Sequence, residues 1–171
     1  MDYNLNRFVE AQEKTYDIAL SEIKNGYKQS HWMWFIFPQH KALGYSDKAK
    51  FYGISDLKEA EQYLRHPILG ERLREISKEL LKHKGKSAID ILGEVDALKL
   101  KSSMTLFEII EPNSVFSEVL DAFYGGKRDD KTVHLLFGTL KNINEEYIKA
   151  YFNLEKIYST LRNKCQGCGG L

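Results

Sequence analysis

The chain has few cysteines and no long hydrophobic run. Its 171 residues include two cysteines, Cys165 and Cys168, both among the last seven residues. Such a pair cannot build the disulfide framework of a small secreted domain, so we expect a reduced, cytoplasmic setting. No run approaches the ~20 apolar residues that a membrane span needs, and the amino terminus shows no apolar signal-peptide core. The sequence therefore predicts a cytoplasmic protein that does not cross a membrane.

The chain also has no large excess of positive or negative residues. The 25 Lys and Arg residues nearly balance the 24 Asp and Glu residues, which leaves a formal net charge of +1. The basic residues are scattered rather than aligned on one face, so no general attraction to nucleic acid or to an anionic membrane is evident. We expect neither as a partner, and the oligomeric state stays open.

The familiar signatures of catalytic and metal sites are absent from the sequence. It contains no nucleophile elbow, no His-Glu-x-x-His and no paired Cys-x-x-Cys motifs. The single Cys-x-x-Cys near the end has no second pair and no histidine at a ligand spacing, which argues against zinc. We therefore expect no metal and no cofactor.

Aromatic residues, by contrast, are abundant and make up 12% of the chain. They gather in Ser30–Gln39, whose central residues from Trp32 to Phe37 are all apolar. Complete burial of such a run would contribute on the order of 10 kcal/mol, so we place it in the core. A buried strand and a buried helical turn fit the pattern equally well. Because Pro38 disfavours helix at Phe37, we predict a buried, partly extended segment.

The rest of the chain has helical periodicity, which predicts an all-α fold. The first helix is expected between a cap at Asn4 and a stop at Gly26. Ser46 is expected to cap a short helix, and Ser87 to open a short turn that Gly93 closes. Another is expected over 94–110, with an apolar stripe at Val95, Leu98, Leu106 and Ile109. We predict one compact multi-helix domain over residues 1–138, an extra helical extension over 139–164 and a flexible tail over 165–171.

Four polar side chains of the predicted 94–110 helix share one face. Asp96 and Lys99 are three residues apart, and Ser102 and Ser103 follow Lys99 at three and four residues. A surface ion pair beside hydroxyls is one interpretation, worth under ~1 kcal/mol. The other is a lysine held by Asp96 that faces a phosphate, because adjacent hydroxyls are unfavourable inside a helix and call for a reason.

The two ends of the aromatic run supply further polar candidates. His31 and Gln39 flank the buried segment, so each must find a hydrogen bond, solvent or a ligand. Trp34 or Tyr52 could stack on a ring-shaped ligand beside them. These residues complete the candidate site.

Several stretches of the chain resemble a known family. They are Ser30–Gln39 followed by Gly44–Ser46, then His66–Leu73, Asp96–Phe107, Phe123–Gly126 and Asp130–Leu136. In this order they resemble a bacterial family of domains of unknown function, often labelled calpastatin-like, over roughly residues 4–138. The resemblance implies a mostly helical fold and no particular reaction, and the tail from Thr139 departs from it. The helical layout and Leu98–Phe107 also resemble, more distantly, the ADP-ribose-linked N-glycosidases, but no catalytic residue matches by position.

These observations lead to two functional hypotheses. In the first, a pocket between the aromatic run and the 94–110 helix binds a small anionic ligand, such as a nucleotide or an ADP-ribose derivative. Trp34 or Tyr52 would stack on its ring, Gln39 would lie beside it, and His31 and Asp96 would be the acid–base groups for cleaving an N-glycosidic bond. In the second, the chain is a non-enzymatic helical adaptor that binds a protein partner.

Overall fold

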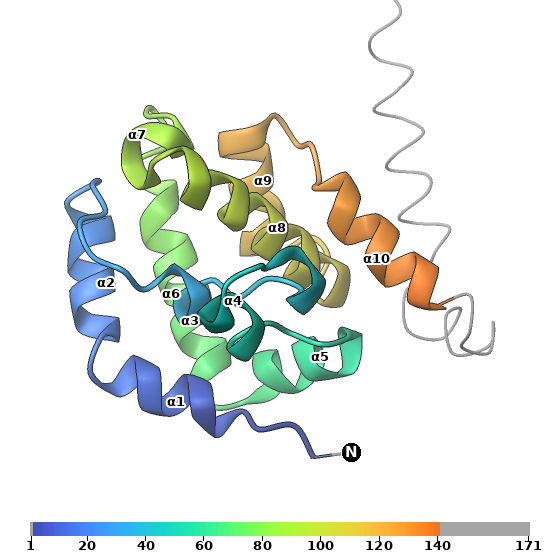
Figure 1. The fold of residues 1–171 in the computed structure, drawn as a ribbon. Helices are drawn as coiled ribbons and strands as arrows, with labels where there is room; N and C mark the ends of the chain where they lie inside the picture. Colours follow the sequence, from blue (N-terminus) through green and yellow to red (C-terminus); the bar gives the residue numbers. More distant parts are fainter. Residues whose placement is uncertain (1, 141–171) are drawn as a thin grey trace, which may run out of the picture. The chain divides into compact units, whose positions relative to one another are not determined.

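The described part of the chain, residues 2–140 of a computed structural model, is entirely helical (Figure 1). Its elements in chain order are α1 (Asn6–Glu13), α2 (Tyr16–Lys24), α3 (Met33–Ile36), the 3₁₀ helix η1 (Lys41–Leu43), α4 (Asp47–Phe51), α5 (Leu57–Arg65), α6 (Leu69–Leu81), α7 (Ala88–Leu92), α8 (Glu94–Ile110), α9 (Val115–Tyr124) and α10 (Asp130–Leu140). The predicted all-α fold is therefore confirmed. The predicted carboxy-terminal extension beyond residue 140 and the Cys165–Cys168 pair lie outside the described residues.

Within residues 2–140, no helix is both long enough and apolar enough to cross a bilayer. The cytoplasmic setting stays a prediction.

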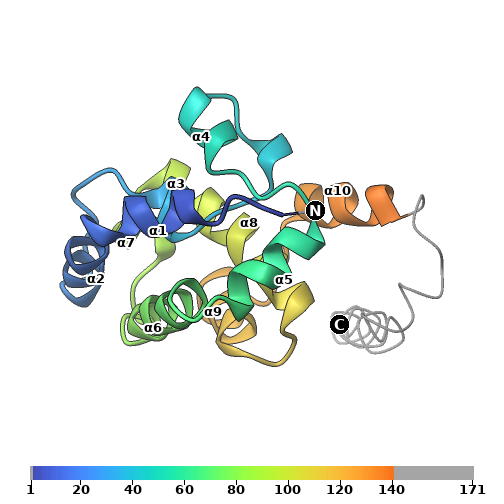
Figure 2. The same cartoon turned by 90° about the horizontal axis from the view of Figure 1, so that it is seen from below.

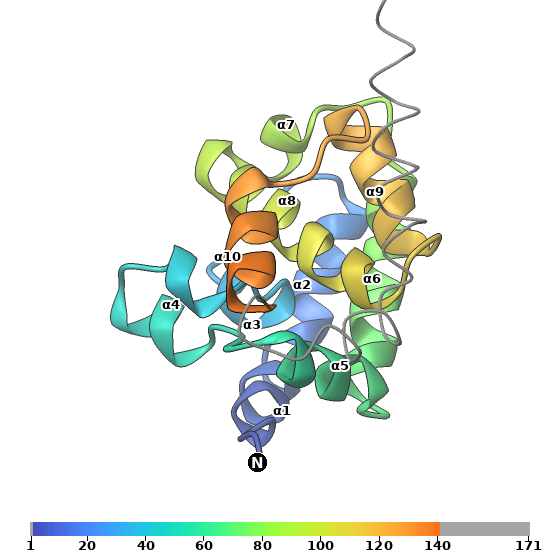
Figure 3. The same cartoon turned by 90° about the vertical axis from the view of Figure 1, so that its right-hand side faces the viewer.

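The chain divides into two units, residues 1–135 and 136–171, and all candidate site residues belong to the first. The centre of that unit is α8, against which α5, α7 and α9 pack, while α9 also lies along α6 (Figure 3). All residues from Ser102 to Ile109 are buried. A helix enclosed on every side needs no polar face, which explains why the second half of α8 lacks the usual amphipathic pattern.

The expected first helix is two helices in the structure. It breaks at Lys14 and Thr15, where the Thr15 amide donates to the Gln12 carbonyl in a tight turn. The apolar spacing continues across the break, because Phe8 on α1 and Ile23 on α2 both enter the core. Periodicity therefore located the buried face but not the turn.

The aromatic run forms one helical turn, α3, and leaves the helix at Phe37, directly before Pro38. Trp32, Met33, Ile36 and Phe37 are buried, as expected. Trp34 and Phe35 are only partly buried, so the expectation that the whole run lies in the core is wrong for these two. A helical turn directs successive side chains around its axis, which leaves part of a four-residue turn facing outward.

The apolar stripe expected on α8 is also partly wrong. Leu106 and Ile109 are buried, but Val95 is 66% and Leu98 is 68% exposed. In the first half of the helix the side facing the core carries Ala97 and Leu100 instead. The buried stripe is shifted around the helix, and Val95 and Leu98 form an apolar pair on the surface.

Candidate functional site

The loop before α3 is fixed by Glu22, a buried carboxylate on α2. Its Oε1 accepts a hydrogen bond from Ser30 Oγ at 2.7 Å, and its Oε2 accepts one from Trp32 Nε1 at 2.6 Å. A buried indole N–H needs such an acceptor. Because Ser30 and Trp32 are both held inward, His31 between them faces outward and is exposed. Glu22 thus directs His31 toward the surface.

Glu22 is ionised in this setting. Desolvation by burial is the largest influence and raises its pKa, but the hydrogen bonds from Ser30 and Trp32, with those from nearby backbone amides, together lower the pKa below its usual value. Donors directed at the charged form favour that form. The loop that presents His31 is therefore held by charge-assisted hydrogen bonds.

The indole ring of Trp34 is surrounded by basic side chains from other elements. Lys48 Nζ on α4 lies 5.1 Å from the ring centre, and Lys99 Nζ on α8 lies 5.3 Å from it. The imidazole ring of His31 lies 6.5 Å away, with the two ring planes tilted by 35°. Ammonium groups within about 6 Å of an indole are attracted by its π electrons. We call Trp34, His31, Lys48 and Lys99 the Trp34 cluster.

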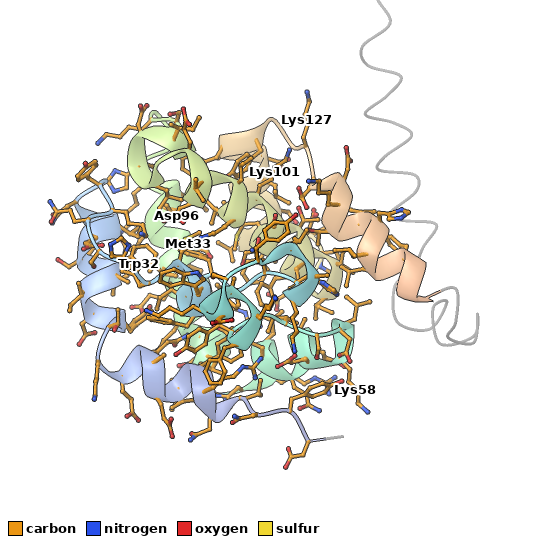
Figure 4. All side chains as sticks on the ribbon, in the orientation of Figure 1. Trp32, Met33, Lys58, Asp96, Lys101 and Lys127 are labelled. Carbon is orange, nitrogen blue, oxygen red and sulfur yellow. The ribbon has the colours of Figure 1, made fainter. Side chains whose placement is uncertain are left out.

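Asp96 forms ion pairs with Lys99 of this cluster and with Lys28, which lies over the buried ring of Trp32. Its Oδ1 lies 3.3 Å from Lys99 Nζ, the ion pair expected from the helical spacing, and its Oδ2 lies 2.8 Å from Lys28 Nζ. Lys28 in turn lies 4.9 Å above the ring of Trp32, and Figure 4 shows Trp32 and Asp96 on the same side of the first unit. One carboxylate faces two ammonium groups, and Lys48 has no carboxylate partner among residues 2–140. The surroundings of Trp34 are therefore positively charged.

The hydroxyl groups of α8 lie apart from this cluster. Ser102 Oγ donates to the Leu98 carbonyl at 3.1 Å, and Thr105 Oγ1 donates to the Lys101 carbonyl at 2.8 Å. Ser103 is fully buried, and its Oγ has no hydrogen-bond partner among the described residues. The crowded hydroxyls thus belong to a buried helix, where two of them bond to their own backbone. The phosphate-binding role of Ser102 and Ser103 stays a prediction.

The ring contacts of Tyr52 and the backbone hydrogen bond of Gln39 are with residues outside the Trp34 cluster. The ring of Tyr52 packs against those of Phe35 and Phe51, with centres 5.2 and 4.8 Å apart. The backbone carbonyl of Gln39 accepts a hydrogen bond from the Ile54 amide at 2.9 Å. Of the predicted site residues, the structure therefore brings together His31, Trp34, Asp96 and Lys99. The roles of Tyr52 and Gln39 in ligand binding stay predictions.

Three residues of this region were missed by sequence reasoning. Lys28, Lys48 and Glu22 come from other segments, so no spacing links them to Trp34 or Asp96. The need of a buried indole for an acceptor pointed to a partner for Trp32, without saying which carboxylate it was. Residues 2–140 also hold no group of three or more His, Cys, Asp or Glu side chains that could bind a metal ion.

Comparison with known proteins places the chain in a family. A family described as "Protein of unknown function (DUF1810)" matches residues 2–136. A crystal structure of the conserved hypothetical protein Rv1873 from Mycobacterium tuberculosis is 46% identical, with a TM-score of 0.77 over 78% of this chain and 96% of that one. A search of curated proteins found no match.

Neither description mentions calpastatin, so the comparisons do not confirm the calpastatin-like label. The family match covers most of the chain and includes every residue of the Trp34 cluster. The chain therefore belongs to the DUF1810 family of proteins of unknown function.

Proposed function

We propose that this protein binds a small anionic ligand with an aromatic ring, such as a nucleotide, at the Trp34 cluster. The observation that carries the proposal is a partly exposed indole with two lysine ammonium groups beside its ring. A partly exposed indole offers a surface on which a base can stack, worth about 1–3 kcal/mol. The ammonium groups of Lys48 and Lys99 over the ring suit phosphate oxygens. No other aromatic ring among the described residues has two ammonium groups as neighbours.

Lys99 is the first phosphate-binding residue of the proposal. Its ion pair with Asp96 fixes its position before a ligand arrives, because the pair is only partly exposed: 23% for the lysine side chain and 18% for the aspartate. A cation that is already held in place loses less side-chain entropy on binding. Asp96 therefore acts as a positioning residue for Lys99.

A thermal-shift measurement tests the binding. Adding ADP or NAD at ~100 times its Kd should stabilise the protein by about 2.7 kcal/mol, which raises the Tm by roughly 5–10 °C. Lys99→Met and Trp34→Ala should each remove most of the shift. Lys58→Met is the matched control, because Lys58 is exposed and far from Trp32 and Asp96 in Figure 4. Absence of any shift in the wild-type protein, or an equal loss in Lys58→Met, would contradict the proposal.

We extend the proposal to cleavage of an N-glycosidic bond at the same place. Water would add to the sugar C1′ as its bond to the base breaks, and the proton lost by water would pass through His31 to the leaving base or to solvent. His31 suits this role because its imidazole is exposed beside Trp34 and offers a ring nitrogen that can take a proton from water. Asp96 is the second candidate, although both of its oxygens face ammonium groups.

Release of free nicotinamide from NAD, measured by chromatography, tests this extension. The wild-type protein should release it over hours, and His31→Ala should lower the rate by 10²-fold or more, the usual contribution of a general acid or base. His66→Ala is the matched control, since the His66 Nδ1 accepts hydrogen bonds from the Ile68 and Leu69 amides and the residue lies at the end of α5. Binding without release by the wild-type protein would leave a binding protein and remove the enzymatic step.

The adaptor hypothesis has an observation of its own. Val95 and Leu98 are exposed one turn apart on α8, directly before Lys99, and Tyr45 is 92% exposed. Exposed apolar and aromatic side chains of this kind are common in protein interfaces. If no nucleotide raises the Tm, we would favour a protein partner that binds at Val95 and Leu98.

A further inference from the structure

Residues 41–53 form an arm that leaves the helical body and returns to it. At its base the Lys41 amide donates to the Ile54 carbonyl at 2.8 Å, and the Ile54 amide donates to the Gln39 carbonyl at 2.9 Å. Between these two hydrogen bonds lie η1 and α4. Figures 2 and 3 both show α4 standing out from the other helices of the first unit.

The helices of the arm pack mainly on each other, and its last residues are tied to the body by Arg7 and by the ring of Tyr52. None of residues 41–52 is buried, and two glycines allow its close internal contacts. A Cβ on Gly44 would lie 2.5 Å from the Cβ of Ala49, and one on Gly53 would lie 2.5 Å from the Cα of Lys41. A segment with few buried contacts has low local stability and opens more readily than the core.

Lys48 is the residue that the arm contributes to the Trp34 cluster. It lies over the same ring as Lys99, but Asp96 pairs with Lys99 and Lys28 and not with Lys48. Two like charges beside one ring repel each other, while each is attracted to the indole. An anion that contacts both ammonium groups would turn the repulsion into attraction.

We infer that Lys48 is a second anion-binding residue of the Trp34 cluster, and that a phosphate group held by Lys48 and Lys99 keeps the arm against Trp34. The inference rests on the proposed function and adds the residue that makes the site select for phosphate. Phosphorylated nucleosides should bind well, whereas the uncharged nucleoside, which has only its ring to offer, should bind weakly. Lys48 would then select for phosphate, while Trp34 holds the ring.

Fluorescence titration of the full chain with ADP and with adenosine tests this selection. Lys48→Met keeps the aliphatic stem and removes the charge, so it should weaken ADP binding about tenfold or more and leave adenosine binding unchanged. Lys50→Met is the matched control: Lys50 is also exposed on α4, and this variant should bind both ligands as the wild-type protein does. Because Lys48 is exposed, both variants should fold, which their circular dichroism will show.

Hydrogen exchange separates an anion-binding role from general stabilisation of the arm. ADP should slow the exchange of amides in residues 41–53 in the wild-type protein and in Lys50→Met, and should not do so in Lys48→Met. If Lys48→Met binds ADP as tightly as the wild-type protein while Lys99→Met does not, the inference fails and the proposed function stands. If ADP does not bind the wild-type protein at all, both fail.

Discussion

Replacing Trp32 by alanine is expected to lower the free energy of unfolding by about 3–5 kcal/mol. The side chain of Trp32 is fully buried, and its ring lies 6.2 Å from that of Phe37. Alanine leaves a cavity in place of the indole and removes the Nε1 donor that binds Glu22. Both losses act in the same direction, because a buried carboxylate that loses a hydrogen bond is itself destabilising. Urea denaturation followed by circular dichroism measures the effect.

Trp34→Ala is the natural comparison, since it changes the same residue type two positions further on. Trp34 is partly exposed and its neighbours are lysine and histidine side chains, so we expect a loss of about 1 kcal/mol. Trp32→Phe keeps a buried aromatic ring but lacks the pyrrole part of the indole with its N–H, which should cost about 1–3 kcal/mol and leave a folded protein. Equal losses in Trp32→Ala and Trp34→Ala would contradict the assignment of one indole to the core and the other to the surface.

The contrast between the two tryptophans shows where sequence reasoning reaches its limit. Both lie in one apolar run, and the periodicity could not distinguish a strand from a helical turn. What separates them is the hydrogen bond from Trp32 to Glu22, a residue on another helix. No local pattern contains that information.

Some local features were predicted correctly, because the residues that form them are close in the sequence. The expected cap at Asn4 is wrong, since Leu5 precedes α1 and no side chain caps that helix. The cap at Ser46 is present, with its hydroxyl accepting from the Ala49 amide, and the Asp96–Lys99 pair follows directly from helical spacing. The short turn expected at Ser87 is a short helix, α7, whose first turn is capped by the Ser87 hydroxyl accepting from the Asp90 amide. Each of these interactions spans three residues. By contrast, Lys28 and Lys48 reach the site from distant segments.

The hydroxyls of α8 illustrate a different limit. Their crowding was a correct observation, and a ligand was one way to explain it. The structure supplies another explanation, because the second half of α8 is enclosed and Ser102 and Thr105 bond to carbonyls of their own helix. Burial of a whole helix depends on its neighbours, α5, α7 and α9, and the sequence of α8 alone does not contain it.

Arg7→Ala is the second change with a large expected effect, again a loss of about 3–5 kcal/mol. Arg7 Nη2 lies 2.7 Å from Glu59 Oε1, and the two side chains are only 9% and 3% exposed. The guanidinium also donates to the carbonyls of Phe51 and Gly53, at 2.8 and 3.1 Å. Removing it leaves a buried carboxylate without its cation and three carbonyls, that of Asn4 being the third, without this donor. That is the costly way to break a buried pair. Urea denaturation again measures the loss.

Two variants test whether the stranded Glu59 carboxylate, rather than the mere loss of a positive charge, makes Arg7→Ala destabilising. Arg65 pairs with Glu61 at 2.8 Å, but the arginine side chain is 74% exposed, so Arg65→Ala should cost under about 1 kcal/mol. In the double variant Arg7→Ala/Glu59→Gln the stranded charge is gone, and the amide oxygen that replaces the carboxylate can still accept from Ser55, which Glu59 Oε2 binds in the wild-type protein. The double variant should therefore be more stable than Arg7→Ala alone. If it is less stable, or if Arg7→Ala is as mild as Arg65→Ala, then burial of the Glu59 charge is not what makes Arg7 important, and its contacts with the end of the arm must be.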